Sequence, residues 1–564
     1  MMTEKLNISP AISTPNFYLD GDIYPFSWNR STTSEPPDIS GLPSMNYALY
    51  LFNIVKFHLG QICRFFDEDS FIAHMQKFYG SNSPEEATKP RFWFVQFLLV
   101  LALGNAFWSR PRNLSGPPGA KFFARAMSVM PTNQTSTGKD SLLAIEALAL
   151  AGVYLYSIDH REAAHVHVGH AIRIAQLEGL HTQLPEEELG AATVARCRNL
   201  WWTLYTMDRL VSSSLGLPMT TQDSDISTLV NTPSTSLHDI IFSLQIRLTQ
   251  MLSYILNTIY KTEKTRLGRF LEITRNILQT MAKYAEEIEQ MLQVNFQGSM
   301  DNVPQETRHM ILLYHQCVII ATRPLLLSVL KERLEKLGHA EEEWQSCLAL
   351  PKSLISTGIK SAVKMLQILC DENCHLEIFL PFELEFTYAA ALHLTMANAL
   401  FPPVADDQTY SKTAHWILDE MIRGGNKVAE ARKAELRCIE GLFEEFAQRV
   451  QQGGLRVLTL SGPGNADVET VAVVENQNGE SLAQPQPPVA QPRVSAQLSL
   501  RGSQSPSADA DTSVNIDSLD DVTGISSYEF LSIVNQIGNP EALYNVLEVG
   551  PEMLEDENGI EPFS

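Results

Sequence analysis

Helical periodicity dominates the sequence between residues 47 and 450. Apolar residues recur there every three to four positions, or on all sides of the expected helix, in one segment after another. Alternation of apolar and polar residues, the pattern of a half-buried strand, is absent except for a weak stretch at 456–460. The pattern therefore predicts an all-α fold, with helices over 47–59, 92–107, 142–156, 163–177, 194–214, 240–259, 270–291, 308–327, 359–369, 386–400 and 426–450.

The two ends of the chain differ from this helical region in composition. Residues 1–42 hold 5 prolines and show no helical period, which predicts a disordered N-terminal segment. The helical domain is expected to extend over 43–452. Residues 453–564 carry 3 basic and 17 acidic residues, a net charge of −14 out of the −23 of the whole chain. This acidic tail, rich in Gly, Pro, Gln and Ser over 461–507, is expected to be largely disordered.

The last part of the tail, residues 509–564, interleaves acidic residues with apolar and aromatic ones. This pattern is typical of short helices that form on a partner, and it predicts a transferable activation segment that a coactivator groove binds. The alternative is that helices around Tyr528 and Leu543 dock back onto the helical domain as a brace. The expected anchors are Leu519, Tyr528, Phe530, Leu531, Tyr544 and Leu547.

Composition excludes several classes of protein. A net charge of −23 gives the chain no general attraction for phosphate backbones or anionic lipid surfaces. Its 7 cysteines are scattered and odd in number, which favours a reducing compartment over a disulfide framework. The N-terminus has no apolar run, so no secretory signal is expected. The longest apolar stretch, 92–107, is shorter than the roughly 20 residues that span a bilayer, and we interpret it as a buried core helix.

Catalytic signatures are missing, so the sequence predicts no catalytic, cofactor-binding or metal-binding residues and no cofactor. Three groups of side chains nevertheless resemble sites. One histidine group lacks a nearby acidic or thiol ligand, a cysteine group lacks a fourth ligand, and an acidic pair lies in a loop where such side chains support turns. We interpret all three as structural rather than as metal or paired-carboxylate sites. They are His165, His167 and His170; Cys370, Cys374 and His375; and Asp223 and Asp225.

The most specific stretch of the chain runs from Arg196 to Pro218. On a helix, its apolar residues form one stripe, and a second ridge alternates arginine with aromatic residues, so that guanidinium planes can lie on aromatic rings. Gly216 and Pro218 then end the helix. The stretch predicts a helix buried on two sides with charge at its edges. The stripe is Leu200, Leu204, Met207 and Val211, and the ridge is Arg198, Trp202, Tyr205 and Arg209.

The run from Arg198 to Ile226 resembles the hallmark of the middle homology region of fungal binuclear zinc-cluster transcription factors. The segments 154–181 and 47–71 are similar to the parts that precede this hallmark in the family, so the resemblance covers about residues 43–400. It implies a nuclear, all-helical regulatory domain of fungal origin that controls a metabolic or secondary-metabolite pathway, with an inducer acting on the helical domain. The matching residues are Leu200, Trp201, Trp202, Tyr205, Asp208, Arg209, Ser213, Leu215, Gly216, Pro218, Asp223, Asp225 and Ile226.

The sequence departs from this family at its N-terminus. The zinc-cluster module needs six cysteines, two pairs of them in C-x-x-C spacing, whereas residues 1–62 contain none and have few basic residues. Leu217 also stands where the family often has a basic or polar residue. We therefore expect a nuclear transcriptional regulator that acts without its own zinc cluster and binds no DNA specifically. Its expected partners are a coactivator or another DNA-bound transcription factor, and a homodimer or heterodimer is compatible with the sequence.

Two other readings stay open. The first is a helical scaffold or small-molecule receptor with no transcriptional role, and the second is an enzyme. The acidic tail separates the regulator from the scaffold, because a scaffold gains nothing obvious from an acidic segment that carries aromatic side chains.

Overall fold

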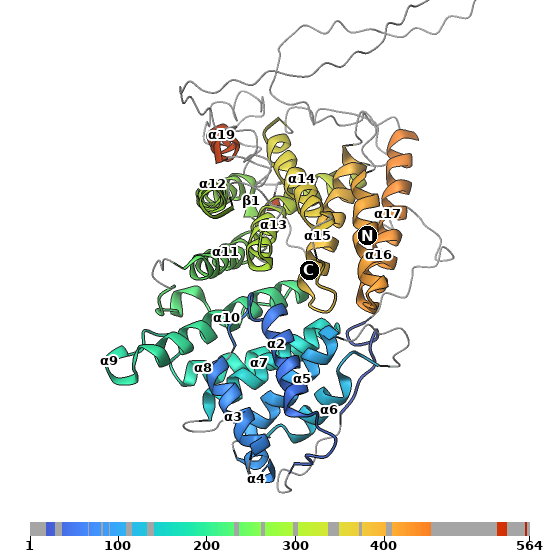
Figure 1. The fold of residues 1–564 in the computed structure, drawn as a ribbon. Coiled ribbons are helices and arrows are strands. Elements are labelled where there is room, and N and C mark those ends of the chain that lie inside the picture. The colour runs from blue at the N-terminus through green and yellow to red at the C-terminus, as the bar shows by residue number, and fades with distance from the viewer. Residues whose placement is uncertain are drawn as a thin grey trace, which may run out of the picture. The chain divides into compact units, whose positions relative to one another are not determined.

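The computed structural model confirms the all-α fold class (Figure 1). Each of the eleven expected helical segments overlaps an observed helix. The structure describes residues 19–28, 37–65, 67–80, 83–89, 91–108, 116–131, 140–230, 236–260, 265–296, 303–336, 349–371, 375–401, 409–452, 527–537 and 559–560.

Helix α5 forms the centre of the N-terminal half of the fold. Its side chains from Phe92 to Leu103 are buried on every side, which explains why the sequence shows an unbroken apolar run there rather than a stripe. Helices α2, α6 and α7 pack around it. The elements of this half are α2 (Met45–His58), α3 (Glu68–Gly80), α4 (Ser83–Thr88), α5 (Arg91–Trp108), α6 (Ala120–Val129), α7 (Ser141–Ser157), α8 (Arg161–Leu177), α9 (Glu186–Leu189), α10 (Ala191–Leu215) and the 3-10 helix η1 (Asp223–Asp225).

Helix α13 has the same central place in the second half. It packs against α11, α14 and α15, and its residues from Met310 to Ala321 are almost all inaccessible to solvent. In Figure 1, α10 lies between the α7–α8 hairpin and α11, and it contacts both α8 and α11. The helices of this half are α11 (Leu237–Thr258), α12 (Leu267–Phe296), α13 (Gln305–Lys336), α14 (Ala349–Cys370), α15 (Phe382–Leu400), α16 (Thr409–Arg423) and α17 (Lys427–Gln452).

Within the described parts of the chain, two helices are long and apolar enough to cross a bilayer, namely Arg91–Trp108 and Gln305–Lys331. Most of each is buried inside the fold, as expected for core helices. Sequence analysis identified the first as a core helix and did not single out the second.

The N-terminal segment was expected to be disordered over 1–42, and this expectation is wrong for residues 19–28. Tyr24 is 5% exposed, and the rings of Phe26 and Trp28 each lie 5.8 Å from the ring of Phe123 on α6. The imidazole of His160 contacts the Tyr24 carbonyl oxygen at 2.8 Å. Proline breaks helical periodicity, but the aromatic residues between the prolines bury enough apolar area to hold an irregular segment in place.

The tail contributes one described helix, α19 (Ser527–Ile537), which packs mainly on α12 and also contacts α14. Phe530, Ile533 and Val534 face the domain and are buried. Residues 527–537 therefore follow the brace alternative rather than the free activation segment. Most of the stretch expected to be largely disordered, 453–564, lies outside the described residues, and so does the weak strand at 456–460. A two-residue strand, β1 (Thr265–Arg266), pairs antiparallel with β2 (Gly559–Ile560).

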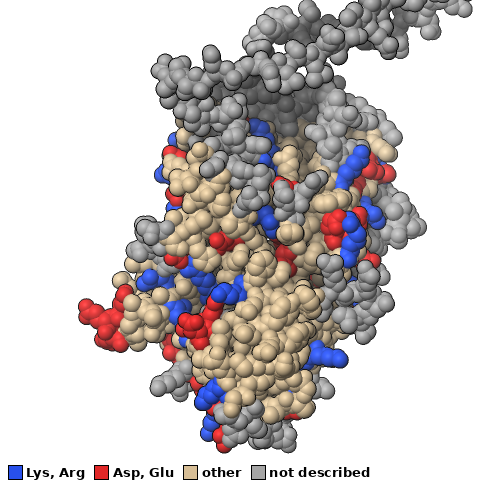
Figure 2. Space-filling view, in the orientation of Figure 1, with Lys and Arg blue, Asp and Glu red and all other residues tan. Residues whose placement is uncertain are grey.

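Several short helices were not expected, namely α3, α4, α6, α9 and α16. The short helix α9 carries three exposed acidic side chains, Glu186, Glu187 and Glu188, which form the acidic edge in Figure 2. Elsewhere in the described part of that face, Lys and Arg side chains lie among Asp and Glu side chains rather than in one basic patch.

Candidate functional site

The longest specific motif of the sequence folds as α10 and the loop that follows it. Gly216 ends the helix in the left-handed conformation, with φ of 67°, and its N–H donates to the Ser212 carbonyl. A side chain with a Cβ is strained at this backbone geometry, which is why glycine suits the position. The loop then turns back over α10 through η1. The helix end predicted from Gly216 and Pro218 is confirmed.

A charged cluster, buried on its α10 side and partly exposed at Asp223, joins α10 to this loop. Arg209 is 1% exposed, and its guanidinium lies 3.6 Å from the ring centre of Tyr205. It forms ion pairs with Asp208 at 3.0 Å and with Asp223 at 2.7 Å, and it donates to the Thr221 carbonyl at 2.7 Å. The Tyr205 hydroxyl donates to the same Asp223 carboxylate at 2.8 Å. We call Tyr205, Asp208, Arg209 and Asp223 the α10 cluster.

The α10 cluster confirms the predicted stacking of arginine on aromatic rings and corrects the predicted position of the charge. Charge was expected at the edges of the helix, but Asp208 and Arg209 are both inside. Because each buried charge has an opposite partner, the pair tolerates burial that an isolated charge could not. Asp223, weighed above as part of a paired-carboxylate site, instead ties the loop to the helix. Asp225 is exposed and points to no catalytic pair.

Trp202 provides a second tie between α10 and the same loop. Its ring is 1% exposed and meets Tyr205 edge-on at 5.2 Å. The indole N–H donates to the Leu229 carbonyl at 3.1 Å. The hallmark residues thus stabilise a helix–loop unit, and they include no nucleophile or metal ligand in a reactive arrangement.

An ion network connects the start of α8 to the last helices of the domain. Asp159 accepts from Arg161 at 2.8 Å and from Arg432 of α17 at 2.9 Å. Arg161 also pairs with Glu385 of α15 at 2.6 Å, and Arg432 pairs with Glu435 at 2.9 Å. All five side chains are largely shielded from solvent. Residues more than 200 positions apart in the chain are therefore held as one unit.

A buried carboxylate lies between α5, α7 and α10. Glu146 is inaccessible to solvent, accepts from the Gln96 amide at 3.0 Å, and pairs with Arg196 at 2.5 Å. Burial raises the pKa of Glu146 to about 7, although Arg196 and Gln96 act in the opposite direction. Arg196 is about a quarter exposed, so solvent weakens its effect on the carboxylate.

The histidine group does not assemble, and the cysteine group is described only in part. His167 contacts its own helix at the Ala163 carbonyl, and His165 lies 3.5 Å from Ser212, so the histidines face different neighbours. Cys374 lies outside the described residues, while Cys370 ends α14. Among the residues that the structure describes, no group of three or more His, Cys, Asp or Glu side chains is placed to hold a metal ion.

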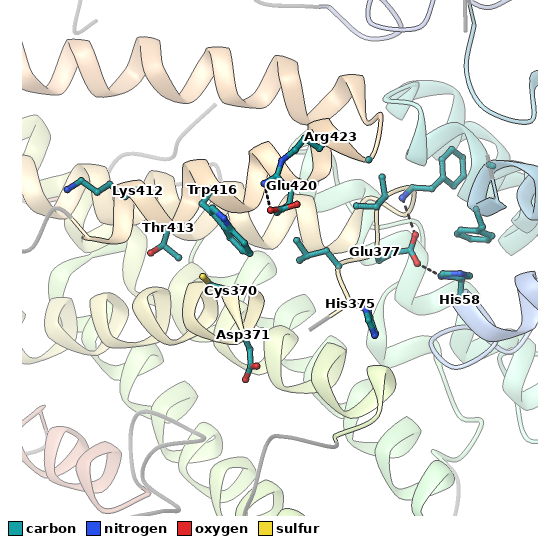
Figure 3. A pocket seen from close by; sticks show the side chains of 16 residues that line it. His58, Cys370, Asp371, His375, Glu377, Lys412, Thr413, Trp416, Glu420 and Arg423 are labelled. Carbon is teal, nitrogen blue, oxygen red and sulfur yellow. Dashed lines mark hydrogen bonds and ion pairs between the residues drawn. The ribbon is translucent and has the colours of Figure 1, made fainter. Parts of the chain in front are cut away.

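Sequence reasoning missed a cavity of about 1210 Å³ (Figure 3). It lies between α16, the end of α14 and the segment 375–379, next to the ends of α2 and α5. Trp416 of α16 projects toward Cys370 across it. The available signal was the amphipathic spacing of residues 409–423, which places Lys412, Trp416 and Arg423 on one helical face.

Comparison with known proteins finds one matching domain and several distant relatives. The model of the fungal specific transcription factor domain matches residues 49–294, a shorter range than the 43–400 given by the resemblance. An uncharacterized transcriptional regulatory protein of Schizosaccharomyces pombe is 25% identical over 65% of this chain and 46% of its own length. Activator of stress genes protein 1 of Candida albicans is 23% identical over 50% of this chain and 31% of its own length.

A third relative, Activator of stress genes 1 of Saccharomyces cerevisiae, is 23% identical over 33% of this chain and 20% of its own length. The chain thus spans less than half the length of these curated relatives. The hallmark residues on α10, its loop and the preceding hairpin all fall inside the matched range. Residues 49–294 thus match the fungal specific transcription factor domain, and the relatives named here are fungal transcriptional regulators.

Proposed function

We propose that this chain is a nuclear transcriptional regulator that controls a metabolic pathway and reaches promoters through another DNA-bound protein. The observation that carries the proposal is the family domain over 49–294, with its hallmark helix and loop. The relatives are described as transcriptional regulators or activators, and a further one is the thiamine repressible genes regulatory protein thi1 of Schizosaccharomyces pombe.

Charge and cysteine usage support an indirect route to DNA for these residues. The net charge of −23 repels phosphate, and the 7 cysteines do not include the C-x-x-C pairs that a zinc cluster uses. On the described part of the face in Figure 2, lysine and arginine side chains lie among acidic ones and do not form the basic stripe of a DNA-binding surface. A protein partner that holds the promoter would remove this requirement.

The acidic tail is the part that we propose to contact the transcription machinery. Within the described helix α19, Tyr528 and Leu531 face outward and are 79% and 43% exposed. Phe530, expected to be an anchor for a coactivator, is fully buried against the domain. The remaining expected anchors, Leu519, Tyr544 and Leu547, lie outside the described residues.

The test is a tethering assay in fungal cells. The full 564-residue chain is fused to an unrelated DNA-binding domain, and reporter transcription is compared with that of the DNA-binding domain alone. We expect altered reporter output, and an increase if the tail activates. Unchanged output from a fusion that accumulates in the nucleus would contradict the proposal and favour the scaffold alternative.

A matched variant isolates the contribution of the tail. Asp517→Asn, Asp520→Asn and Asp521→Asn together remove three negative charges and keep side-chain size. A lower output from this variant supports an activating tail, whereas equal output places the activity elsewhere in the chain. In parallel, fluorescence anisotropy of the purified chain with duplex DNA at physiological salt is expected to give no sequence-dependent binding. Submicromolar sequence-dependent binding would contradict the indirect route.

A further inference from the structure

The cavity beside α16 lies mostly outside the family domain. Of its lining residues, only His58, Ala106 and Phe107 fall within the matched range 49–294. The others come from α14, the segment 375–379, and α16 with the glycine that follows it. Its volume of about 1210 Å³ exceeds the roughly 300–1,000 Å³ usual for small-molecule sites. The cavity can therefore accept a ligand of at least drug size.

The acidic groups of the cavity are already engaged. Glu377 pairs with His58 at 2.5 Å and accepts from the Phe379 N–H at 3.0 Å. Glu420 pairs with Arg423 one turn further along α16, as Figure 3 shows. Asp371 also has an interaction partner. A cationic ligand would have to compete with these partners for each carboxylate.

The basic groups of the lining include one cation that no described residue pairs with. The side chain of Lys412 is exposed and forms no ion pair or hydrogen bond with any residue that the structure describes. The lining as a whole is not basic, because it carries the carboxylates of Asp371, Glu377 and Glu420 against the permanent cations Lys412 and Arg423. An anionic group of a ligand would therefore bind at Lys412 itself, where the ammonium group is available.

Trp416 gives the cavity an apolar wall. Its indole ring is 43% exposed although it lies in a concave site, and it projects toward Cys370 on the opposite side (Figure 3). The side chains of Phe107, Ile378 and Phe379 add further apolar surface to the lining. An exposed indole in such a site can stack on a flat apolar group and remove both surfaces from water.

We propose that this cavity binds an organic anion with a planar apolar body. Trp416 stacks on the body, and Lys412, four residues earlier on the same face of α16, binds the anionic group. The proposal concerns binding alone, so its test does not depend on whether the chain regulates transcription.

The test uses two fluorescent probes that differ in one charged group. 1-Anilinonaphthalene-8-sulfonate has a planar aromatic body and a sulfonate, and N-phenyl-1-naphthylamine has the same body without the sulfonate. Each is titrated into the purified full chain, and Kd is obtained from probe emission. We expect saturable binding of the sulfonate. Trp416→Ala should weaken binding of both probes by about tenfold, the order of one aromatic stacking contact.

Lys412→Gln separates the role of charge from that of the apolar wall. It should weaken binding of the sulfonate by roughly threefold to fivefold, as expected for one exposed charge contact, and leave the Kd of the neutral probe unchanged. Trp108→Ala and Lys121→Gln are matched controls, because Trp108 is 58% exposed and Lys121 is an exposed lysine of α6, and both lie outside the cavity. Neither control should change either Kd.

Three results would overturn the proposal. They are no saturable binding of the sulfonate, equal effects of Trp416→Ala and Trp108→Ala, and a Lys412→Gln effect that is the same for both probes. Since Trp416 and Lys412 are both exposed, the variants should keep the thermal unfolding midpoint of the wild type. This measurement confirms that a lost affinity comes from the cavity.

Discussion

The guanidinium of Arg209 lies on the ring of Tyr205, and both side chains reach the same carboxylate, that of Asp223. Two residues one helical turn apart on α10 thus fix a loop residue that lies more than ten positions further along the chain. The loop cannot leave the helix without exposing the Arg209–Asp208 pair to partial hydration and separating Asp223 from both donors. The hallmark residues therefore hold the loop on α10, and they do so mainly through a buried ion pair.

Arg209→Met should lower the unfolding free energy of the domain. Asp208 is inaccessible to solvent and would lose its positive partner, although Thr220 would still donate to it. Leaving one charge of a buried pair uncompensated costs about 3–5 kcal/mol of unfolding free energy. Urea denaturation followed by circular dichroism measures the difference. Arg269→Met is the control, because Arg269 is an exposed arginine of α12, and its effect should stay within about 0.5 kcal/mol.

Trp202→Ala should lower the unfolding free energy by about 3–5 kcal/mol, because it removes a fully buried ring and creates a cavity. It also leaves the Leu229 carbonyl without its indole donor. Trp108→Ala offers the same chemical change at an exposed ring and should cost far less. Similar thermal midpoints for the two variants would show that burial of Trp202 does not stabilise the domain.

Local sequence pattern was enough to predict most of the helices and some of the contacts between α10 and its loop. The unbroken apolar run of α5 predicted complete burial, and the ridge of Trp202, Tyr205 and Arg209 predicted the stacking. The local pattern did not predict that Arg209 is buried. An arginine in a sequence looks the same whether or not a distant carboxylate compensates its charge. Asp223 lies in a loop, where helical periodicity gives no information about its contacts.

Contacts between residues far apart in the chain could not be predicted from local sequence patterns. The Asp159–Arg432 pair joins residues 273 positions apart, and no local spacing indicates it. The cavity beside α16 was missed for the same reason, since its walls come from separate helices. The packing of Tyr24 was missed because prolines in its neighbourhood predict irregular backbone, and irregular backbone was equated with the absence of packing.

Stability should depend on pH through Glu146. Its pKa is raised from 4.5 in the unfolded chain to about 7 by burial, so the folded state holds this proton more tightly than the unfolded state does. The stabilisation from the protonated carboxyl is complete below about pH 4.5 and is lost as the pH rises through 7. The rise from 4.5 to about 7 corresponds to about 3–4 kcal/mol, using 1.36 kcal/mol for each pKa unit.

Glu146→Gln removes this titration while keeping size and one carbonyl acceptor. The unfolding free energy of the variant relative to the wild type should therefore rise between pH 5 and pH 8, by up to about 2–3 kcal/mol. Urea midpoints of both proteins at the two pH values give the comparison, which cancels the titration of all other groups. A constant difference, or one that moves in favour of the wild type at pH 8, would contradict the assigned pKa.

The docking of α19 should depend on Phe530 and not on its neighbour Leu531. Phe530 is fully buried and Ile533 and Val534 are nearly so, whereas Leu531 points outward and is 43% exposed. The ion pair between Glu529 and Lys360 of α14 is about half exposed on both sides and contributes little. Because an 11-residue helix is marginal in water by itself, docking relies on these three apolar side chains.

Phe530→Ala should therefore undock α19 while the rest of the domain stays folded, and Leu531→Ala is the matched control. Removal of a buried phenyl ring costs about 3–5 kcal/mol, which is comparable to the whole docking energy expected from three apolar side chains. Hydrogen exchange of the amides of 527–537 should become fast in Phe530→Ala and stay slow in Leu531→Ala, with little change in α5 or α13. Equal protection in both variants would mean that another contact holds the helix. Phe530 cannot contact a coactivator while it is buried, so docking of α19 and a role of Phe530 as a coactivator anchor exclude each other.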